Sequence, residues 1–394
     1  MVLNIKTRIL QCKKLMNVGA VLTICLIGVV GCQQKNPESV IASYRSVDKT
    51  WHEIEDKVSE KSNNKDEYDS MMKAQAGEHP DVGPAVDASF KIASTSADNK
   101  KVFEALKFII EETPGTSEAP QWMSRTLPYL QEKHLQKPEM MKLAYNIYRS
   151  YENDIDGYED FMQALAQQNP DVSVQANVWY LLARTHYYFQ NVPDVTQQER
   201  EVRKVNALNY LVKISDNPDY ADVILYSRRN KKGKPPTPLL ERVKSLTFAI
   251  HNLSIGSAIP DAKQNDLTGK PDKISNYKGK VLLVDFWATW CGPCVASIPE
   301  LVEMKKEYGE GFEILSLSVD DALSDLTDFQ EDTDMPWQHW YVSRKGKIVK
   351  DWNISAFPTY ILVDQTGHIK LITSEMTESF KETIKETIKN SINQ

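Results

Sequence analysis

Two cysteines three positions apart are the residues of this sequence best suited to covalent chemistry. Cys291 and Cys294 lie in a segment that reads TWCGPCV, between an apolar run and a helical pattern. Free N–H groups at a helix N-terminus favour an anion and lower a thiol pKa from about 8.5 to about 3.5–7.5. We therefore expect Cys291 to be a thiolate that attacks disulfides, and Cys294, one turn further along, to attack the resulting mixed disulfide. Pro293 fits the first helical turn, where no N–H is needed, and Gly292 leaves room for a substrate chain.

Other uses of a Cys-x-x-Cys pair fit the sequence less well. A zinc site needs four ligands, yet this pair holds the only cysteines after residue 32, and His339 and His368 lack the spacing of ligands. A c-type haem site needs histidine directly after the second cysteine, where Val295 stands. A purely structural disulfide that closes so short a loop would add little stability. The sequence therefore predicts a redox pair that works without a metal or another cofactor.

The first 31 residues have the pattern of a cleaved export signal. A basic start without acidic residues precedes the uncharged run Val18–Gly31, which is short for a membrane span of about 20 residues. The run ends in VVGC and resembles the bacterial lipobox, in which the cut precedes a cysteine that becomes lipidated. We expect residues 1–31 to be a lipoprotein signal peptide and Cys32 to carry the lipid, with an uncleaved N-terminal anchor as the alternative.

Processing would make the protein more acidic. The formal net charge is −7, and removal of residues 1–31 takes four basic residues away, which gives about −11 (−7 − 4). An acidic chain without basic clusters is a poor candidate for nucleic-acid binding, and an exported protein can keep disulfides. We expect a lipid-anchored protein of the bacterial cell envelope that faces the periplasm. In some bacteria, an aspartate directly after the lipidated cysteine resembles a signal that retains the protein in the inner membrane. This chain has Gln33 at that position, which favours the outer membrane.

The elements that must position the cysteines change in type near residue 252. Between Glu38 and Asn252, apolar residues recur at helical steps of three and four, and Ser89–Ile110 is expected to be one helix. We expect an all-α domain over residues 32–252, either a helical repeat or an irregular helical domain. The basic, proline-rich stretch at 228–238 is expected to be a linker.

Residues 253–394 are expected to form an α/β domain. Apolar runs at Val281–Phe286 and Phe312–Val319 indicate buried strands, each followed by a helical pattern. Thr359–Val363 and Ile369–Ile372 flank a turn and indicate a hairpin, before a final amphipathic helix. The order βαβαββα predicts a mixed sheet flanked by helices.

The stretch around the cysteine pair resembles a known family. VLLVDFWATWCGPCVASIPEL closely resembles the active-site strand and helix of the thioredoxin fold, in the style of TlpA/ResA-like thiol–disulfide oxidoreductases. Residues 277–280 (YKGK) and 354–360 (ISAFPTY) resemble further motifs of that family in the same order, so the resemblance covers about residues 254–392. It implies a thioredoxin-like fold and dithiol–disulfide exchange with protein substrates.

The resemblance also implies roles for the matching residues. Cys291 would be the attacking cysteine and Cys294 the resolving one. Pro358 would be the cis proline that faces the disulfide, with an ordinary trans proline as the alternative. The residues expected around the substrate groove are Trp290, Gly292, Pro293, Phe357 and Thr359, with Trp287 packed near the site.

Asp285 is a candidate proton acceptor. It lies six residues before Cys291 in a run that reads as a buried strand, so desolvation should raise its pKa. It resembles the buried aspartate of thioredoxins, a proposed proton acceptor for the resolving cysteine. The chain has Ser297 where many TlpA/ResA-like proteins have glutamate, which favours a proton-handling role for Asp285. It has Val295 where a basic residue is usual, so the Cys291 thiol is expected to be somewhat less acidic than in those relatives. A water-exposed position at the sheet edge is the alternative.

The family resemblance bears on the direction of the reaction. Gly-Pro between the cysteines resembles reducing thioredoxins, so we expect a reductase, and an exported reductase implies a membrane electron donor of the thiol-relay type.

A thioredoxin-fold peroxidase is an alternative function that fits the sequence less well, because its motif has Thr-x-x-Cys and here Thr289 precedes Cys291 by only two residues. A third hypothesis makes the helical half a scaffold or partner-binding domain with a secondary redox domain. We expect a combination, in which the helical domain selects the substrate or partner.

Overall fold

The computed structural model describes residues 36–59, 61, 69–73, 78–150, 155–192, 195–227 and 236–392. The predicted signal peptide (1–31), the predicted lipidation of Cys32 and most of the predicted linker at 228–238 lie outside the described residues. The chain divides into two compact units, Met1–His134 with Glu152–Gly157, and Leu135–Tyr151 with Tyr158–Gln394. The predicted domain boundary at residue 252 lies within the second unit and stays a prediction. None of the described helices combines the length and apolar character that crossing a membrane requires.

The first unit consists of helices packed around a small apolar core. Tyr44, Val86 and Phe108 are buried together in this core, and the ring of Tyr44 meets the ring of Phe108 edge-on at 5.7 Å. The long helices among the described residues of this unit are α3 (Pro37–Ser59), α5 (Gly83–Thr95), α6 (Asn99–Glu112) and α7 (Ala119–Lys133), and residues 69–73 are also helical.

The prediction of one continuous helix over Ser89–Ile110 is wrong, because α5 and α6 are separate helices. The carboxylate of Asp98 accepts hydrogen bonds from the backbone N–H groups of Lys100 and Lys101, at 2.9 and 3.3 Å. This side chain satisfies N–H groups that have no partner at a helix start, and so it fixes the beginning of α6. Residues 94–101 read STSADNKK and hold a single apolar residue, so the break was visible in the sequence and the prediction overlooked it.

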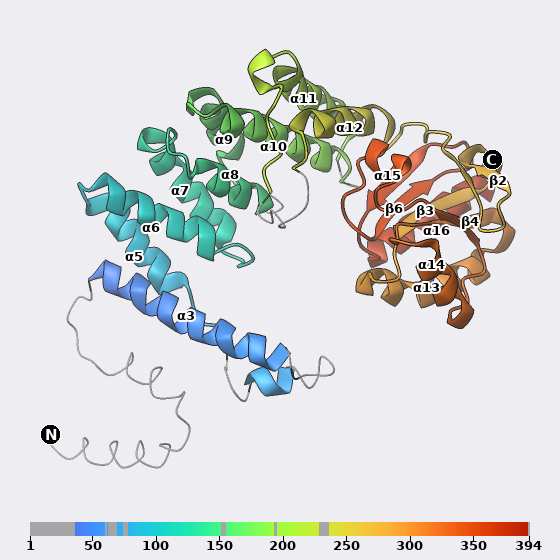
Figure 1. The fold of residues 1–394 in the computed structure, drawn as a ribbon, viewed down its shortest axis with the longest axis horizontal. Helices are drawn as coiled ribbons and strands as arrows, with labels where there is room; N and C mark the ends of the chain where they lie inside the picture. Colours follow the sequence, from blue (N-terminus) through green and yellow to red (C-terminus); the bar gives the residue numbers. More distant parts are fainter. Residues whose placement is uncertain are drawn as a thin grey trace, which may run out of the picture. The chain divides into compact units, whose positions relative to one another are not determined.

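The second unit begins with further helices. Asp171 caps α10, and Thr196 with Glu199 forms a capping box at the start of α11. Helix α10 contacts α8, α9, α11 and α12, so it is the central helix of this group (Figure 1). The bounds are α8 (Met140–Arg149), α9 (Tyr158–Gln168), α10 (Val172–Gln190), α11 (Gln197–Ser215) and α12 (Leu239–Asn252).

The rest of the second unit is the predicted α/β structure. A short hairpin of β1 (Lys263–Asn265) and β2 (Pro271–Lys273) precedes a five-stranded sheet in the order β5-β4-β3-β6-β7. β3 is parallel to β4 and antiparallel to β6, so the sheet is mixed, as predicted. The sheet strands are β3 (Val281–Trp287), β4 (Phe312–Ser318), β5 (Gln338–Tyr341), β6 (Thr359–Val363) and β7 (Ile369–Thr373). The helices are α13 (Gly292–Tyr308), α14 (Leu323–Asp332), α15 (Lys347–Asp351), which the sequence did not indicate, and α16 (Glu378–Ile392).

The sheet has an apolar cluster on each face, and helices cover both (Figure 1). Leu283 of β3 packs with Leu301 of α13 and Phe380 of α16. Its neighbour Leu282 belongs to the other cluster, which includes Leu326 of α14. Because side chains alternate along a strand, β3 is buried along its whole length, which is why it reads as a continuous apolar run. This is the thioredoxin-like arrangement that the resemblance implied.

Helices α10 and α12 pack against the α/β part of the second unit. The Tyr187 hydroxyl donates to the Leu253 carbonyl at 3.1 Å, and the Gln190 side-chain amide donates to the Ser254 hydroxyl at 3.2 Å. Leu253 itself belongs to the same apolar cluster as Leu282 of β3. The end of α12 is therefore part of the core that supports the sheet.

Candidate functional site

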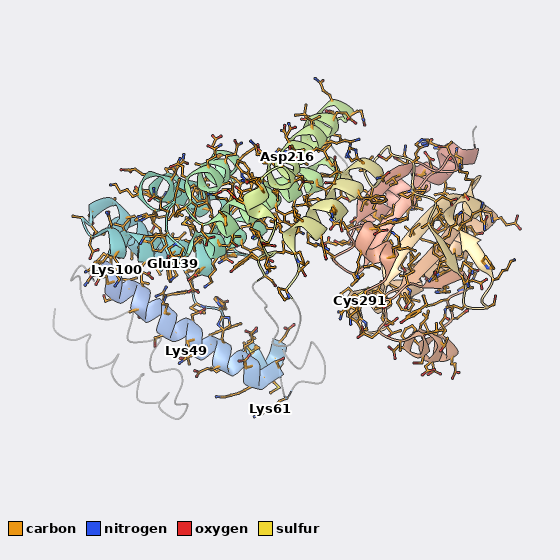
Figure 2. The ribbon with its side chains drawn as sticks, turned by 45° about the horizontal axis from the view of Figure 1, so that its top comes forward. Lys49, Lys61, Lys100, Glu139, Asp216 and Cys291 are labelled. Carbon is orange, nitrogen blue, oxygen red and sulfur yellow. A yellow bond between two sulfur atoms is a disulfide. The ribbon has the colours of Figure 1, made fainter. Side chains whose placement is uncertain are left out.

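The two cysteines form a disulfide at the start of α13. The Sγ atoms of Cys291 and Cys294 are 2.06 Å apart, and the Cα atoms are 5.2 Å apart. Both residues are buried, with exposed fractions of 5% and 2%. Gly292 and Pro293 between them are exposed, so the turn that joins the cysteines faces solvent (Figure 2 labels Cys291). A partner chain can thus reach this turn, while the sulfurs have limited contact with water.

Cys291 occupies the N-cap position of α13. Its sulfur accepts a hydrogen bond from the backbone N–H of Cys294 at 3.3 Å, and Pro293 lies in the first turn of the helix. A sulfur at this position is surrounded by N–H groups that lack a helical partner and by the positive end of the helix dipole. The same contacts stabilise a thiolate on Cys291 once the disulfide is reduced.

Pro358 is buried, and the Phe357–Pro358 peptide bond is cis, as the resemblance implied. The Thr359 hydroxyl donates to the carbonyl of Ala356 at 2.8 Å, which closes a local turn around the proline. Phe357 and Thr359 are partly exposed. The sequence alone could not exclude a trans proline here.

An exposed aromatic surface lies beside the disulfide turn. Trp290 is 51% exposed, and its ring meets the Phe357 ring edge-on at 5.9 Å. The Arg344 guanidinium lies over the Trp290 ring, 5.5 Å from its centre, a contact that no sequence motif indicated. Trp287 has a different place: it is 1% exposed and packs against Phe329 at 5.5 Å. Trp290, Phe357 and Arg344 are therefore available to a substrate, whereas Trp287 is part of the core.

Asp285 lies on the central strand β3, not at the sheet edge, and is 3% exposed. The Ser316 hydroxyl of β4 donates to its Oδ2 at 3.0 Å, and Trp337 Nε1–H donates to that same hydroxyl at 2.9 Å. Among the described residues, Asp285 Oδ1 has no hydrogen-bond partner. Desolvation raises the pKa of Asp285 to about 7, and the Ser316 hydrogen bond opposes this rise. Asp285 can thus gain or lose a proton near neutral pH.

Ser297 and Tyr360 connect β6 with Cys294. Tyr360 stands opposite Asp285 in the antiparallel register of β3 and β6. The Ser297 hydroxyl donates to the Cys294 carbonyl at 2.7 Å and accepts a hydrogen bond from the Tyr360 hydroxyl at 2.7 Å. Burial raises the pKa of Tyr360, and the nearby Asp285 charge raises it further. Ser297 therefore holds the first turn of α13 in place at the position where many relatives were expected to have glutamate.

Asp320 is a buried carboxylate that the sequence analysis did not single out. Its Oδ1 accepts hydrogen bonds from the backbone N–H and the hydroxyl of Thr289, at 3.0 and 2.8 Å. Its Oδ2 accepts one from the Ser318 hydroxyl at 2.8 Å. Thr289 lies two residues before Cys291, so Asp320 anchors the loop that carries the disulfide. The available signal was its place directly after β4, because the carboxyl ends of the parallel strands β3 and β4 meet at one edge.

We expect Asp320→Ala to lower the free energy of unfolding by about 3 kcal/mol, because it leaves the buried Ser318 hydroxyl and the partly buried donors of Thr289 without an acceptor. Urea denaturation followed by tryptophan fluorescence measures this change. Asp321→Ala is the matched control: its side chain is 75% exposed and pairs with Arg344 at 4.0 Å. The control should stay within about 0.5 kcal/mol of the parent protein. Equal effects of the two substitutions would contradict the anchoring role.

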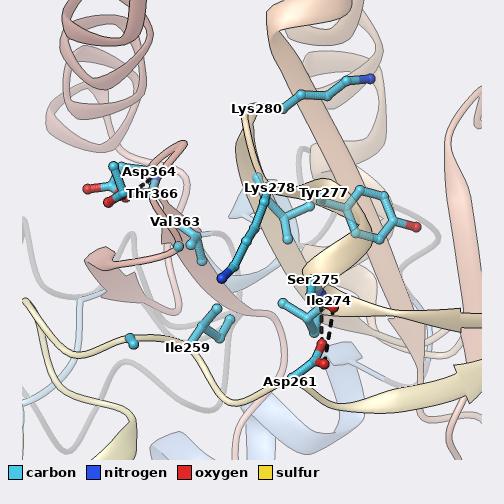
Figure 3. A pocket seen from close by; sticks show the side chains of 13 residues that line it. Ile259, Asp261, Ile274, Ser275, Tyr277, Lys278, Lys280, Val363, Asp364 and Thr366 are labelled. Atoms are coloured by element: carbon cyan, nitrogen blue, oxygen red, sulfur yellow. Dashed lines mark hydrogen bonds between the residues drawn. The ribbon is translucent and has the colours of Figure 1, made fainter. Parts of the chain in front are cut away.

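A separate cavity of about 170 Å³ lies near the β6–β7 turn. Figure 3 shows Lys278 between Val363 and Ile274, and it shows the two hydrogen bonds that the Asp261 carboxylate accepts from Ser275, at 2.7 and 3.1 Å. None of the residues that line this cavity belongs to the predicted site. The disulfide turn, not this cavity, is the candidate active site.

The chain is similar to known thiol–disulfide oxidoreductases. A family model described as Redoxin matches residues 254–387, which begin after α12. The chain is 32% identical over 128 residues to the thiol-disulfide oxidoreductase ResA of Geobacillus kaustophilus, covering 32% of this chain and 73% of ResA. It is 27% identical over 151 residues to ResA of Bacillus subtilis, covering 36% and 84%. Among solved structures, a thiol:disulfide interchange protein DsbE from Chlorobium tepidum matches at 27% identity and a TM-score of 0.32, covering 35% of this chain and 97% of that chain.

Proposed function

This chain belongs to the family of thiol–disulfide oxidoreductases that includes ResA, and on that premise we propose that it reduces protein disulfides through Cys291 and Cys294. The observation that carries the proposal is the Cys291 sulfur at the N-cap of α13, bonded to Cys294 and beside the exposed Trp290. A family member acts on thiols and disulfides of proteins.

In the proposed reaction, the Cys291 thiolate attacks one sulfur of a substrate disulfide. A Cys291–substrate disulfide forms, the substrate S–S bond breaks, and the released substrate thiolate takes a proton from water. Asp285 then accepts the proton of the Cys294 thiol, and the Cys294 sulfur attacks Sγ of Cys291. The protein disulfide closes and the second substrate thiolate leaves, so two electrons have passed from the cysteine pair to the substrate.

The proposed direction is reduction, with electrons supplied by a membrane donor of the thiol-relay type. Support comes from the Gly-Pro pair between the cysteines, which resembles reducing thioredoxins. Each turnover leaves Cys291 and Cys294 as a disulfide, so an outside dithiol must reduce them again. No metal or nucleotide is needed for these steps, because both electrons reside on sulfur.

We propose that the protein is exported and anchored by a lipid on Cys32, facing the periplasm, with the outer membrane favoured. The support is the basic start, the short apolar run and the VVGC motif of residues 1–32. Several acyl chains would bind a bilayer firmly, at about 0.8 kcal/mol for each buried CH₂ group. Disulfides of proteins persist in the periplasm, so a reductase there has substrates.

The in vivo redox state of the pair tests the proposed direction. Cells are quenched with acid, free thiols are alkylated with a mass-adding reagent, and membrane and soluble fractions are analysed separately. We expect both Cys291 and Cys294 to be alkylated, and the protein to be in the membrane fraction. A Cys291→Ser/Cys294→Ser protein is the control without reactive thiols, and Cys32→Ser is the control for the anchor. A closed disulfide in growing cells would contradict steady-state reduction, and a membrane-bound Cys32→Ser protein would contradict the lipid anchor.

A further inference from the structure

Three side chains with metal-binding atoms converge in the first unit. Asp48 and His52 lie one turn apart on α3, and His79 lies shortly before α5. One potential ligand atom of each lies within 4.8 Å of those of the other two. His79 Nε2 is 3.0 Å from Asp48 Oδ1, and His52 Nδ1 is 3.6 Å from Asp48 Oδ2. The cluster is in a different unit from the disulfide and has no part in the reaction above.

The hydrogen bonds of His79 orient it as in a metal ligand. Its Nδ1 lies 3.1 Å from the Pro80 carbonyl oxygen, and since a carbonyl only accepts, Nδ1 carries the proton. In the neutral ring, Nε2 therefore presents its lone pair towards the Asp48 carboxylate. Metal-bound histidines commonly donate their other N–H to a backbone carbonyl in this way.

The contact between His79 and Asp48 has the geometry of an ion pair and also that of two ligands of one metal ion. A proton on Nε2, or a metal ion between Nε2 and the Asp48 carboxylate oxygen 3.0 Å away, would satisfy both groups. Ligand atoms of a tetrahedral zinc ion, with bonds of about 2.0–2.1 Å, lie about 3.3 Å apart. The His79–Asp48 pair is close to this spacing. His52 Nδ1 lies 3.0 Å from the Asp48 backbone carbonyl and donates to it, so the half-exposed His52 ring would have to turn to offer a nitrogen lone pair to the ion.

We propose that Asp48, His52 and His79 bind one divalent transition-metal ion of the class that prefers imidazole, with Zn²⁺ as the expected ion. Two imidazoles and a carboxylate are typical ligands of zinc, and water or another carboxylate completes the coordination. The Tyr44 hydroxyl donates to Asp48 Oδ1 at 3.3 Å and orients the carboxylate from within the unit.

The ion would connect two segments that are distant in the sequence. His52 and His79 are 27 positions apart, and α3 packs against α5 in the core of the first unit. An ion that binds the folded protein and not the unfolded chain raises thermal stability in proportion to its affinity. We infer a structural role, in which the metal holds the segment before α5 against α3.

A zinc titration of the full chain tests this site. The protein carries no histidine tag and has the Cys291–Cys294 disulfide closed, so that thiols cannot bind the metal. Isothermal calorimetry should give one Zn²⁺ per chain, and Co²⁺ should give the visible absorption of a site with nitrogen ligands. At a hundredfold excess over the dissociation constant, we expect Zn²⁺ to raise the unfolding midpoint of the first unit by about 5 °C or more.

Substitutions locate the binding. His79→Gln and His52→Gln should each weaken Zn²⁺ binding by at least about a hundredfold, since even changes around metal ligands cost about 10–100-fold. His251→Gln is the matched control, because His251 is exposed near the end of α12 in the second unit. It should leave both stoichiometry and affinity unchanged. Far-ultraviolet circular dichroism checks that each variant is folded, and Asp48→Asn serves as a third ligand variant. Absence of saturable binding to the parent protein, or equal binding by the ligand variants and the control, would overturn the proposal.

Discussion

Cys291→Ser should abolish disulfide reduction, with a loss of at least about a thousandfold in the rate for a protein disulfide. In the proposed reaction, Cys291 at the N-cap of α13 supplies the attacking sulfur, and a serine hydroxyl at this position does not exchange with disulfides. Reduction of insulin by the full chain, with a dithiol as the electron source, measures the rate. Activity of Cys291→Ser close to that of the parent protein would contradict the assignment.

Cys294→Ser should behave differently, because the attacking sulfur remains and the resolving one is lost. We expect this variant to accumulate a mixed disulfide with its substrate, visible as a mass increase that a strong reductant removes. The Cys291→Ser/Cys294→Ser protein is the matched control, since it also lacks the internal disulfide but has no sulfur to trap. If the Cys291→Ser protein restored normal growth to a strain that lacks this protein, the result would favour the hypothesis that the helical half is a scaffold.

Asp285→Asn should change how stability depends on pH. The folded protein holds the Asp285 proton up to a pKa of about 7, whereas the unfolded chain loses it near 3.8. Below pH 3.8 both states are protonated, and between about 4 and 7 the folded protein binds more protons. The free energy of unfolding therefore falls as the pH rises through this window and stays at the lower level above it. Asparagine does not ionise, so this decrease disappears in the variant.

The difference between parent and variant gives the size of the effect. The rise of the Asp285 pKa from 3.8 to about 7 corresponds to a decrease of at most about 4 kcal/mol in the free energy of unfolding between pH 4 and pH 8. Urea denaturation of the disulfide-bonded chain at both pH values measures it. Asp321→Asn, a change at an exposed carboxylate, is the control. A difference between Asp285→Asn and the parent that is the same at both pH values would show that Asp285 is ionised throughout.

The same substitution should slow the closing of the active-site disulfide. Single-turnover reduction of a chromogenic disulfide separates the attack by Cys291 from resolution by Cys294. For the parent, we expect the resolving step to speed up with pH and level off above about 7, as Asp285 loses its own proton. Asp285→Asn should lower this rate by about a hundredfold near pH 7, the size of a general-base effect.

Ser316→Ala is a second test of Asp285 as the base, because the direction in which it should move the pH midpoint of the resolving step is known. Its hydroxyl donates to Asp285 Oδ2 and opposes the rise in pKa, so its loss should move the midpoint of the resolving step to higher pH. A midpoint that stays fixed in this variant would exclude Asp285 as the titrating base, whereas a lower maximal rate alone would indicate a structural effect.

The sequence by itself determined the parts that depend on local pattern. The strands predicted at Val281–Phe286 and Phe312–Val319 and the hairpin of β6 and β7 follow from apolar runs whose period differs from that of helices. The predicted order βαβαββα left out the short elements β5 and α15. Cys291, Gly292 and Pro293 are adjacent in the chain, so the redox motif needs no tertiary information to be recognised. The family resemblance then implied a cis bond before Pro358, because the flanking motif is also continuous in sequence.

The tertiary structure decided what depends on contacts between distant segments. Asp320 lies 31 positions after Thr289 and becomes its anchor only because β3 and β4 are parallel neighbours. The central position of β3 removes water from Asp285, which the apolar run alone could not distinguish from an edge strand. His79 meets Asp48 and His52 because α3 and the segment before α5 pack together. Hydrogen bonds, desolvation and metal ligation act over a few ångströms in space, and sequence separation does not record such distances.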